Sequence, residues 1–318
     1  MPGVTGSGPG TRISLPALRR GDTVGIIAPA SNIKRDALFA GCEGLQRMGY
    51  KPFYFDSILE QDLYFAGSLE RRTSELHEMF EREDVRAIVC ARGGYGCNYL
   101  VPGLDLDVIR RHPKIFVGYS DVTTLLTLLC DEAGLNVFHG PMVAKDFVAE
   151  DGVDSASWEN ALGGAALWDI TDGGARGLRD GLSEGMFYGG CLPMLAATLG
   201  TPHEIQTAGR ILFLEDIASK PYQIDRMLMQ LKLAGKFKDV RAIIFGEMND
   251  CVQHPQQGYT LEEVVLRIVG DLNIPVAFGL RSGHVARGNI TLPLGARASL
   301  EVTAQEVRLK FLESATTA

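Results

Sequence analysis

The sequence has little that would hold it to a membrane or to nucleic acid. None of its apolar runs reaches the roughly 18 residues that a membrane-spanning helix needs. Acidic residues outnumber basic residues by 39 to 31, and the net charge of −8 comes without any run of Lys or Arg. Proteins that bind nucleic acid or an anionic membrane surface carry a basic patch, so we expect neither partner.

The N-terminus lacks the pattern of a secretory signal. Residues 1–10 are rich in Gly, Pro, Ser and Thr, with neither a basic start nor an apolar core. We therefore expect residues 1–12 to form a disordered tail, and we expect the protein to be cytoplasmic.

Metal and nucleotide signatures are also missing. The six cysteines and six histidines are scattered, without a Cys-x-x-Cys pair, which suits a reducing compartment. Cys90 and Cys130 lie in apolar segments and are predicted to be buried thiols. His77 begins a His-Glu-x-x-His pattern, but Glu81 stands where the second histidine would fall. No strand is followed by a nucleotide-binding glycine motif. We expect no metal and no cofactor.

What the first half does contain is an alternation of apolar strands and amphipathic helices. This pattern predicts a parallel sheet covered on both faces over residues 13–150. The predicted strands are 22–29, 51–55, 85–90, 114–117 and 137–138, and the predicted helices are 35–48, 69–82, 106–111 and 121–133.

The second half predicts a different α/β domain, with mixed strands, over residues 185–318. Residues 151–184, rich in Gly, Ala and Asp, are predicted to be a linker with room for an edge hairpin. The later strands are expected at 210–214, 240–245, 275–279, 289–293 and within 298–312, and the helices at 221–234 and 261–272.

Three turns follow strands of the first sheet, at the edge where α/β proteins bind ligands: residues 92–96, 118–121 and 139–141. In the second turn, Ser120 stands between an apolar strand and a helix, where a nucleophilic serine has its hydroxyl exposed. The sequence there is Gly-Tyr-Ser-Asp-Val, which only approximates the Gly-x-Ser-x-Gly elbow. The alternative is that Ser120 caps the helix and Asp121 complements its dipole.

Two residues of the second half complete a possible triad. Glu215 ends an apolar strand, and His284 follows another strand and a glycine. A serine needs a base near neutral pH, and the base needs a carboxylate to hold its tautomer. The chain order Ser, acid, His is one that serine hydrolases use. Taken alone, a histidine in a loop is more often solvated than catalytic, and a glutamate at a strand end is more often a surface carboxylate.

The glycine turn after the third strand could supply an oxyanion hole. Gly94 and its neighbours let backbone N–H groups approach a ligand closely, and the N–H of Asp121 would be the second donor. The alternative is a tight turn with no ligand.

The chain resembles the LD-carboxypeptidases, the muramoyltetrapeptide carboxypeptidases, which are related to the microcin C immunity peptidases. The resemblance covers residues 22 to 300 and rests on motifs in matching order: 25–31, 64–68, 91–96, 117–123, 138–142, 189–192, 199–202, 214–216, 220–228, 283–284 and 292–295. It implies a flavodoxin-like or Rossmann-like parallel sheet in the nucleophile domain and a C-terminal domain that supplies the acid and the base. It also implies that Ser120 is the nucleophile, His284 the base and Glu215 the acid that orients it. It also implies oxyanion amides at Asp121 and Gly94.

The resemblance further implies release of D-alanine from the murein tetrapeptide in peptidoglycan recycling, by a homodimer. Arg92 is a hypothetical cation for the terminal carboxylate, against the alternative of a salt bridge within its turn. Cys191 departs from the asparagine that is common in relatives, and the helix around Lys220-Pro221-Tyr222 is similar to the recycling branch. The alternatives are an immunity-type peptidase acting on aminoacyl-nucleotide peptides and a non-catalytic ligand-binding protein.

Overall fold

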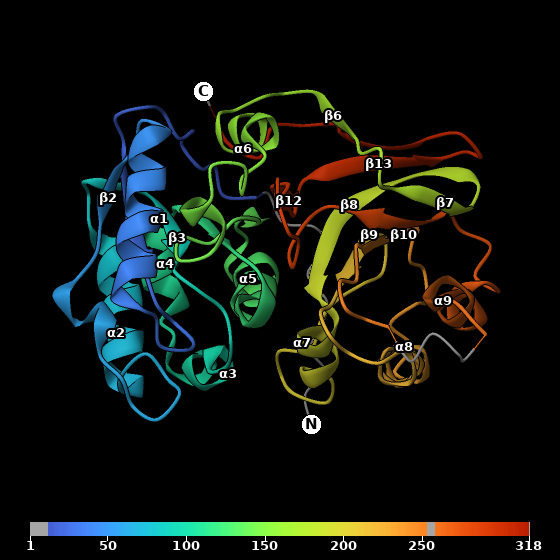
Figure 1. Ribbon diagram of the computed structural model, residues 1–318, viewed down its shortest axis with the longest axis horizontal. Helices are drawn as coiled ribbons and strands as arrows, with labels where there is room; N and C mark the ends of the chain where they lie inside the picture. The colour runs from blue at the N-terminus through green and yellow to red at the C-terminus, as the bar shows by residue number, and fades with distance from the viewer. Residues whose placement is uncertain (1–11, 253–257, 318) are drawn as a thin grey trace.

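The computed structural model describes residues 12–252 and 258–317, which form two sheets side by side (Figure 1). The predicted tail, residues 1–12, lies outside the described residues except for Arg12. That side chain donates to the carbonyl oxygens of Cys130, at 2.5 Å, and Leu135, at 3.1 Å.

The first sheet has the strand order β12-β5-β4-β3-β1-β2. Its five consecutive strands run parallel, in the 2-1-3-4-5 order of flavodoxin-like folds, which confirms the predicted fold class. Only β12 is antiparallel to its neighbour. The strands are β1 (Thr23–Ile27), β2 (Lys51–Phe53), β3 (Val85–Cys90), β4 (Ile115–Gly118), β5 (Val137–His139) and β12 (Leu292–Leu294).

Helices pack on both faces of this sheet, so its central strands are almost wholly buried and nearly continuous in apolar residues (Figure 1). Asp105 caps α4, accepting hydrogen bonds from two N–H groups of its first turn. The predicted helix 121–133 is divided into a 3₁₀ turn, an α-helix and a π turn. The helices are α1 (Arg35–Arg47), α2 (Leu69–Glu81), α3 (Cys97–Leu100), α4 (Leu106–Arg111), α5 (Thr123–Leu128) and α6 (Ser155–Leu162).

The second sheet is mixed, as predicted, in the order β6-β14-β13-β8-β9-β10-β11-β7. Its centre, β8 to β11, is parallel, and the flanking strands are antiparallel. Three helices gather on one side of it (Figure 1). The strands are β6 (Trp168–Thr171), β7 (Arg176–Arg179), β8 (Gly181–Cys191), β9 (Arg210–Glu215), β10 (Ala242–Gly246), β11 (Val276–Leu280), β13 (Arg297–Val302) and β14 (Val307–Phe311), and the helices are α7 (Leu192–Ala197), α8 (Pro221–Leu233) and α9 (Leu261–Val269).

The interpretation of residues 151–184 as a linker with an edge hairpin is wrong. This segment folds into α6, β6 and β7, and the two strands lie at opposite edges of the second sheet, next to β14 and β11. Each strand pairs with a partner more than 90 residues later in the chain, so nothing local to the segment signals its pairing.

The second half of the chain also contributes a strand to the first sheet, and the two ends of the chain meet. β12, from the second half, is the edge strand of the first sheet. The backbone of Thr317 bonds with that of Leu15 and Ala17 near the other end of the chain. All six cysteines are free and buried, which confirms the predicted buried thiols at Cys90 and Cys130. In the parts of the chain that the structure describes, none of the helices has the length and apolar character to cross a bilayer.

Candidate active site

Ser120 stands on a tight, strained turn. It follows β4 and opens the 3₁₀ turn Ser120–Val122 that leads into α5. Its φ is +63°, in the left-handed region, which costs a non-glycine residue about 1–3 kcal/mol. The turn is close enough that a Cβ on Gly118 would lie 2.7 Å from the Val122 side chain. Such strain at a strand-to-helix turn is typical of an exposed nucleophile.

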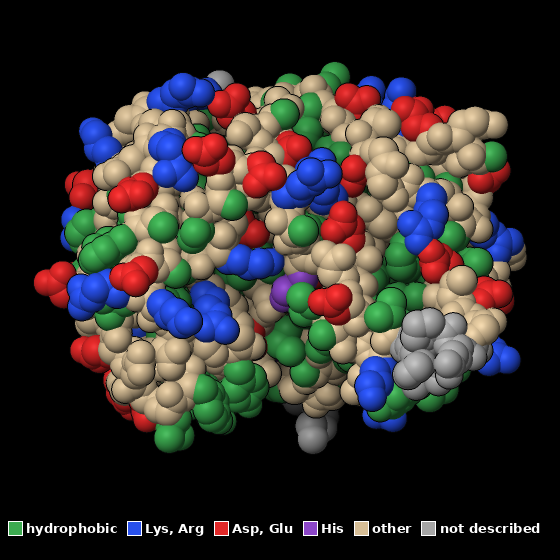
Figure 2. Space-filling view, viewed as in Figure 1, with side chains coloured by type: hydrophobic (Ala, Val, Ile, Leu, Met, Phe, Trp, Pro, Cys, Tyr) green, Lys and Arg blue, Asp and Glu red, His purple; other side chains and the backbone are tan. Residues whose placement is uncertain are grey.

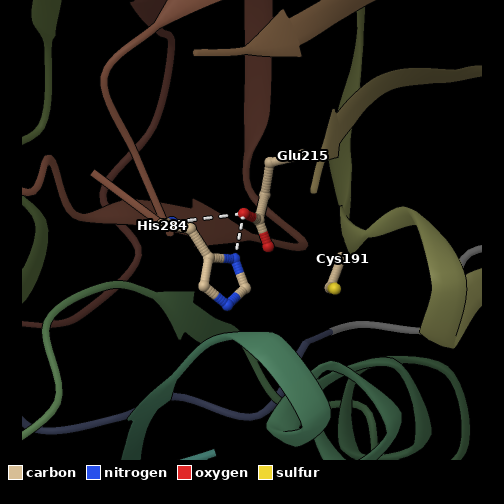
Figure 3. A group of neighbouring side chains, drawn as sticks. All are labelled: Cys191, Glu215 and His284. Atoms are coloured by element: carbon tan, nitrogen blue, oxygen red, sulfur yellow. Dashed lines mark hydrogen bonds and ion pairs between the residues drawn. The ribbon is translucent and has the colours of Figure 1, made fainter. Parts of the chain in front are cut away.

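The structure brings Ser120, His284 and Glu215 together in one chain of hydrogen bonds. His284 Nε2 lies 3.0 Å from Ser120 Oγ, and His284 Nδ1 lies 2.7 Å from Glu215 Oε2. The same carboxylate oxygen accepts the backbone N–H of His284 at 3.2 Å (Figure 3). The order of contacts is that of a serine, a base and an orienting carboxylate.

All three residues come from the carboxyl ends of strands, as the sequence predicted. Ser120 follows β4, Glu215 is the last residue of β9, and His284 follows β11 after a short loop. Glu215 is 1% exposed. Burial alone would raise the pKa of Glu215, but the neighbouring His284 and His139 outweigh burial and hold that pKa well below its usual range. The carboxylate is therefore ionised at neutral pH, as an orienting acid requires.

The glycine turn predicted to hold the oxyanion lies against Ser120. A Cβ on Gly93 would be 2.8 Å from Ser120 Cβ and 3.3 Å from the backbone nitrogen of Asp121, so only glycine fits there. Gly94 has a φ of +107° and faces Ser31 instead. Among the described residues, the N–H groups of Gly94 and Asp121 have no acceptor. Both donors are therefore available; that of Asp121 directly follows the serine, and that of Gly94 follows the glycine that lies against it.

Two buried polar side chains hold this turn in place. The Asp121 carboxylate accepts the N–H of Cys97 at 2.8 Å, and burial raises the pKa of Asp121. The guanidinium of Arg72, 3% exposed, donates to the carbonyl oxygens of Pro29 and Gly96. These bonds tie the turns after β1 and β3 to the turn that carries Ser120.

Comparison with known proteins identifies the family. Residues 24–140 match the LD-carboxypeptidase N-terminal domain, and residues 184–300 match the LD-carboxypeptidase C-terminal domain. The chain belongs to the LD-carboxypeptidase family. It is therefore a member of a family of serine peptidases, as the resemblance in the sequence implied.

Individual relatives agree over nearly the whole length of this LD-carboxypeptidase. The chain is 38% identical over 293 residues to a probable murein peptide carboxypeptidase of Bacillus subtilis, covering 89% of this chain and 90% of the relative. It is 31% identical to the murein tetrapeptide carboxypeptidase of Pseudomonas aeruginosa, covering 87% and 92%. A solved structure of MccF in complex with glutamyl sulfamoyl guanosine superposes with a TM-score of 0.88 at 25% identity, covering 96% of this chain and 99% of that one.

Among the described residues, Arg92 makes no contact with the candidate triad of Ser120, His284 and Glu215. Its guanidinium donates to the carbonyl oxygen of Asn32 at 3.1 Å, and it pairs with no carboxylate among the described residues. The alternative of a salt bridge within the turn is therefore wrong, because a carbonyl takes the place of the acid. Arg92 as the cation for the terminal carboxylate stays a prediction.

Lys145 is a cation that no sequence motif pointed to. Its ammonium group lies 5.1 Å from the ring centre of Tyr119, and that buried ring packs edge-on against His284 at 5.1 Å. Lys145 is exposed and belongs to no sequence motif, so its nearness to His284 becomes evident only from its contact with Tyr119. Lys and Arg side chains, with some acidic ones among them, surround the hollow where the two halves of the molecule meet (Figure 2).

Cys191 completes a group that resembles a metal-ligand set. Its sulfur and one ligand atom each of Glu215 and His284 lie within 4.8 Å of one another (Figure 3). Burial, and then the carboxylates of Glu215 and Asp216, raise the pKa of the Cys191 thiol well above its usual range. Because metals bind thiolates, and because Glu215 and His284 already share a hydrogen bond, these residues fit a hydrogen-bonded pair beside a neutral thiol better than a metal centre.

Proposed function

We propose that this LD-carboxypeptidase hydrolyses the peptide bond between an L-centre and a C-terminal D-amino acid, releasing D-alanine from murein tetrapeptide in peptidoglycan recycling. The observation that carries the proposal is the chain of hydrogen bonds from Ser120 through His284 to Glu215. The names of the relatives from Bacillus subtilis and Pseudomonas aeruginosa support a murein peptide as the substrate.

The first half-reaction forms an acyl-enzyme. Ser120 Oγ attacks the carbonyl carbon while His284 Nε2, at 3.0 Å, takes the hydroxyl proton. Glu215 holds the Nδ1–H tautomer of His284 and stabilises the imidazolium that forms. When the tetrahedral intermediate collapses, the C–N bond breaks and His284 gives its proton to the leaving amine of D-alanine.

The second half-reaction repeats these steps with water. His284 takes a proton from the water, the hydroxide adds to the ester carbonyl, and the proton returns to Ser120 Oγ as the acid leaves. In both halves the N–H groups of Asp121 and Gly94 are the proposed donors to the oxyanion. One such donor is worth about 3–4 kcal/mol in a serine peptidase.

A second substrate class follows from the likeness to MccF, which has been solved with glutamyl sulfamoyl guanosine. Exposed aromatic rings lie beside the glycine turn: Tyr95 and Tyr99 are 43% and 47% exposed, with ring centres 6.0 Å apart. Such rings give a planar base a surface on which to stack. An immunity-type peptidase acting on aminoacyl-nucleotide peptides is therefore the alternative proposal.

The deciding experiment measures D-alanine release from murein tetrapeptide by the purified protein and by Ser120→Ala, with the all-L peptide as a control. Release that needs both Ser120 and the L,D bond supports the proposal, and release by Ser120→Ala overturns the mechanism. If folded protein releases nothing, cleavage of an aminoacyl sulfamoyl nucleotide supports the immunity-type alternative. Failure on both substrates leaves the non-catalytic binding protein.

Two properties that the resemblance implied stay predictions. A homodimer would appear in light scattering at twice the 34.5 kDa mass of the chain. A cytoplasmic location would appear as recovery of the protein with the cytoplasm after cell fractionation.

A further inference from the structure

His139 lies on the far side of Glu215 from His284. It is the last residue of β5, is fully buried, and stands opposite Gly118 in the neighbouring strand β4. Its Nε2 is 3.8 Å from Glu215 Oε1. This is longer than a hydrogen bond, yet neither atom has a hydrogen-bond partner among the described residues. The triad uses the other oxygen of Glu215 and leaves this histidine without a role.

The hydrogen bond at the other ring nitrogen of His139 shows that Nδ1 carries a proton. Nδ1 lies 3.0 Å from Ser282 Oγ, and Ser282 Oγ lies 2.7 Å from the carbonyl oxygen of Ile290. A hydroxyl has one proton, and the carbonyl can only accept, so Ser282 donates to Ile290 and accepts from Nδ1–H. If Nε2 carried no proton, its lone pair would face a buried carboxylate oxygen, which is unfavourable.

We propose that His139 is a positioning residue that stands beside Glu215 as an imidazolium, directing its Nε2–H at Oε1 and so fixing the carboxylate for His284. The inference rests on the proposed function, since it gives His139 a part in orienting the same triad. It supplies the buried Oε1 with a donor, which a carboxylate in an apolar setting needs. Within the described part of the chain, the titratable groups that face the ring are Glu215 and Tyr119, the latter at 5.8 Å between ring centres, while Phe213 covers a third side.

Cys191 is the rival donor to the same carboxylate. Its neutral thiol lies near Glu215, but it is a weak donor and carries no charge (Figure 3). The positive charge of an imidazolium compensates a buried carboxylate, whereas a thiol does not. Replacing Cys191 by Ala should therefore disturb the triad less than replacing His139.

The kinetic test compares His139→Gln, which keeps an N–H donor without the charge, with His139→Phe, which keeps a ring without a donor. We expect His139→Phe to lower kcat for D-alanine release about 10- to 100-fold, with KM nearly unchanged, as for groups that orient a catalytic side chain. His139→Gln should recover part of kcat, and Cys191→Ala should lose less than His139→Phe. Equal loss in both His139 variants, or a loss that tracks their Tm, would indicate a purely structural role and overturn the proposal.

A direct test needs no activity. Nitrogen NMR of the full chain labelled with ¹⁵N-histidine, with the His139 signals assigned from their loss in His139→Gln, reports the protons on each ring nitrogen. We expect both His139 nitrogens to be protonated at the assay pH; a nitrogen without a proton overturns the inference. Active wild type with an unprotonated His139 nitrogen refutes only the inference, and a doubly protonated His139 in a protein that releases no D-alanine refutes only the proposed function.

Discussion

The segments that hold Ser120 and His284 each contain a residue with a left-handed backbone, but at different places relative to the functional side chain. On the nucleophile side it falls on Ser120 itself, with a φ of +63°, and on the base side it falls on Gly283, next to His284, with a φ of +92°. Glycine adopts this conformation without strain, whereas serine does not. In the proposed mechanism the hydroxyl must stand at the turn, so the strain at Ser120 cannot be removed without losing the nucleophile.

On the base side, glycine is required chiefly because there is no space for a side chain at position 283. A Cβ on Gly283 would lie 2.7 Å from the Glu215 carboxylate and 2.9 Å from His139 Cε1. A side chain there would push the acid away from His284. The contrast is thus between a strained residue that is the proposed nucleophile and an unstrained residue that keeps room for the proposed acid and base.

The largest effect on kcat is expected from replacing Glu215, the proposed orienting carboxylate. Glu215→Gln keeps the shape of the side chain but removes the charge that holds the tautomer of His284, so kcat should fall about 10⁴-fold. The measurement is kcat for D-alanine release, with Asp216→Asn as the matched control because Asp216 is the neighbouring buried carboxyl. A similar loss in both variants would contradict a specific role for Glu215.

The same carboxylate predicts how stability depends on pH. The pKa of Glu215 is lower in the folded protein than in the unfolded chain, mainly because the two histidines outweigh burial. Its stabilisation is therefore fully present above the ordinary glutamate value, about 4.3, and is lost as the pH falls through the folded value. The free energy of unfolding of wild type minus that of Glu215→Gln should shrink in urea titrations from about pH 7 to about pH 3. A difference that grows on acidification would contradict the assignment.

Gly283→Ala tests the space on the base side. We expect a lower kcat and a loss of roughly 2–3 kcal/mol of stability, because the new Cβ adds overpacking to the cost of its left-handed φ. Gly21→Ala is the matched control, since Gly21 has a φ of +93° and a Cβ added there would have nothing within 4 Å. It should lose only about 1 kcal/mol and no activity. Equal effects at the two positions would show that strain, and not space, governs Gly283.

Lys145 and Arg92 can be compared as cations for the terminal carboxylate of the substrate. Lys145 lies over Tyr119, which contacts His284. The ammonium group of Lys145 is 3.9 Å from Asp146 Oδ1, while Arg92 is hydrogen-bonded to the backbone carbonyl of Asn32. Lys145→Met should therefore raise KM about tenfold with kcat nearly unchanged, the size of one exposed charged hydrogen bond. Arg92→Met should change KM less, and the reverse order would restore Arg92 as the carboxylate site.

Local patterns made the nucleophile side predictable. The apolar strand, the turn and the helix around Ser120 are contiguous, and the alternation of such units predicts the parallel sheet. The convergence of Glu215 and His284 on Ser120 came from the family resemblance, because those residues lie 95 and 164 positions further along the chain.

The features that the sequence could not predict arise from contacts between residues far apart in the chain. β6 pairs with β14 and β7 with β11, both far later in the chain, so nothing within their own segment distinguishes it from a linker. His139 begins one of the three turns that follow strands of the first sheet, but its contact with Glu215 arises only when the two sheets meet. Lys145 belongs to no pattern at all.

The smallest predicted effect isolates the strain at the nucleophile. Ser120→Gly removes both the hydroxyl and the left-handed penalty, whereas Ser120→Ala removes the hydroxyl and keeps the penalty. Elsewhere glycine costs about 0.5–1 kcal/mol relative to alanine, but here it should be more stable by about 1 kcal/mol. Urea unfolding of the two inactive variants measures the difference without interference from catalysis. If alanine is the more stable, the turn carries no strain of its own, and the contrast between Ser120 and Gly283 is then one of space on both sides.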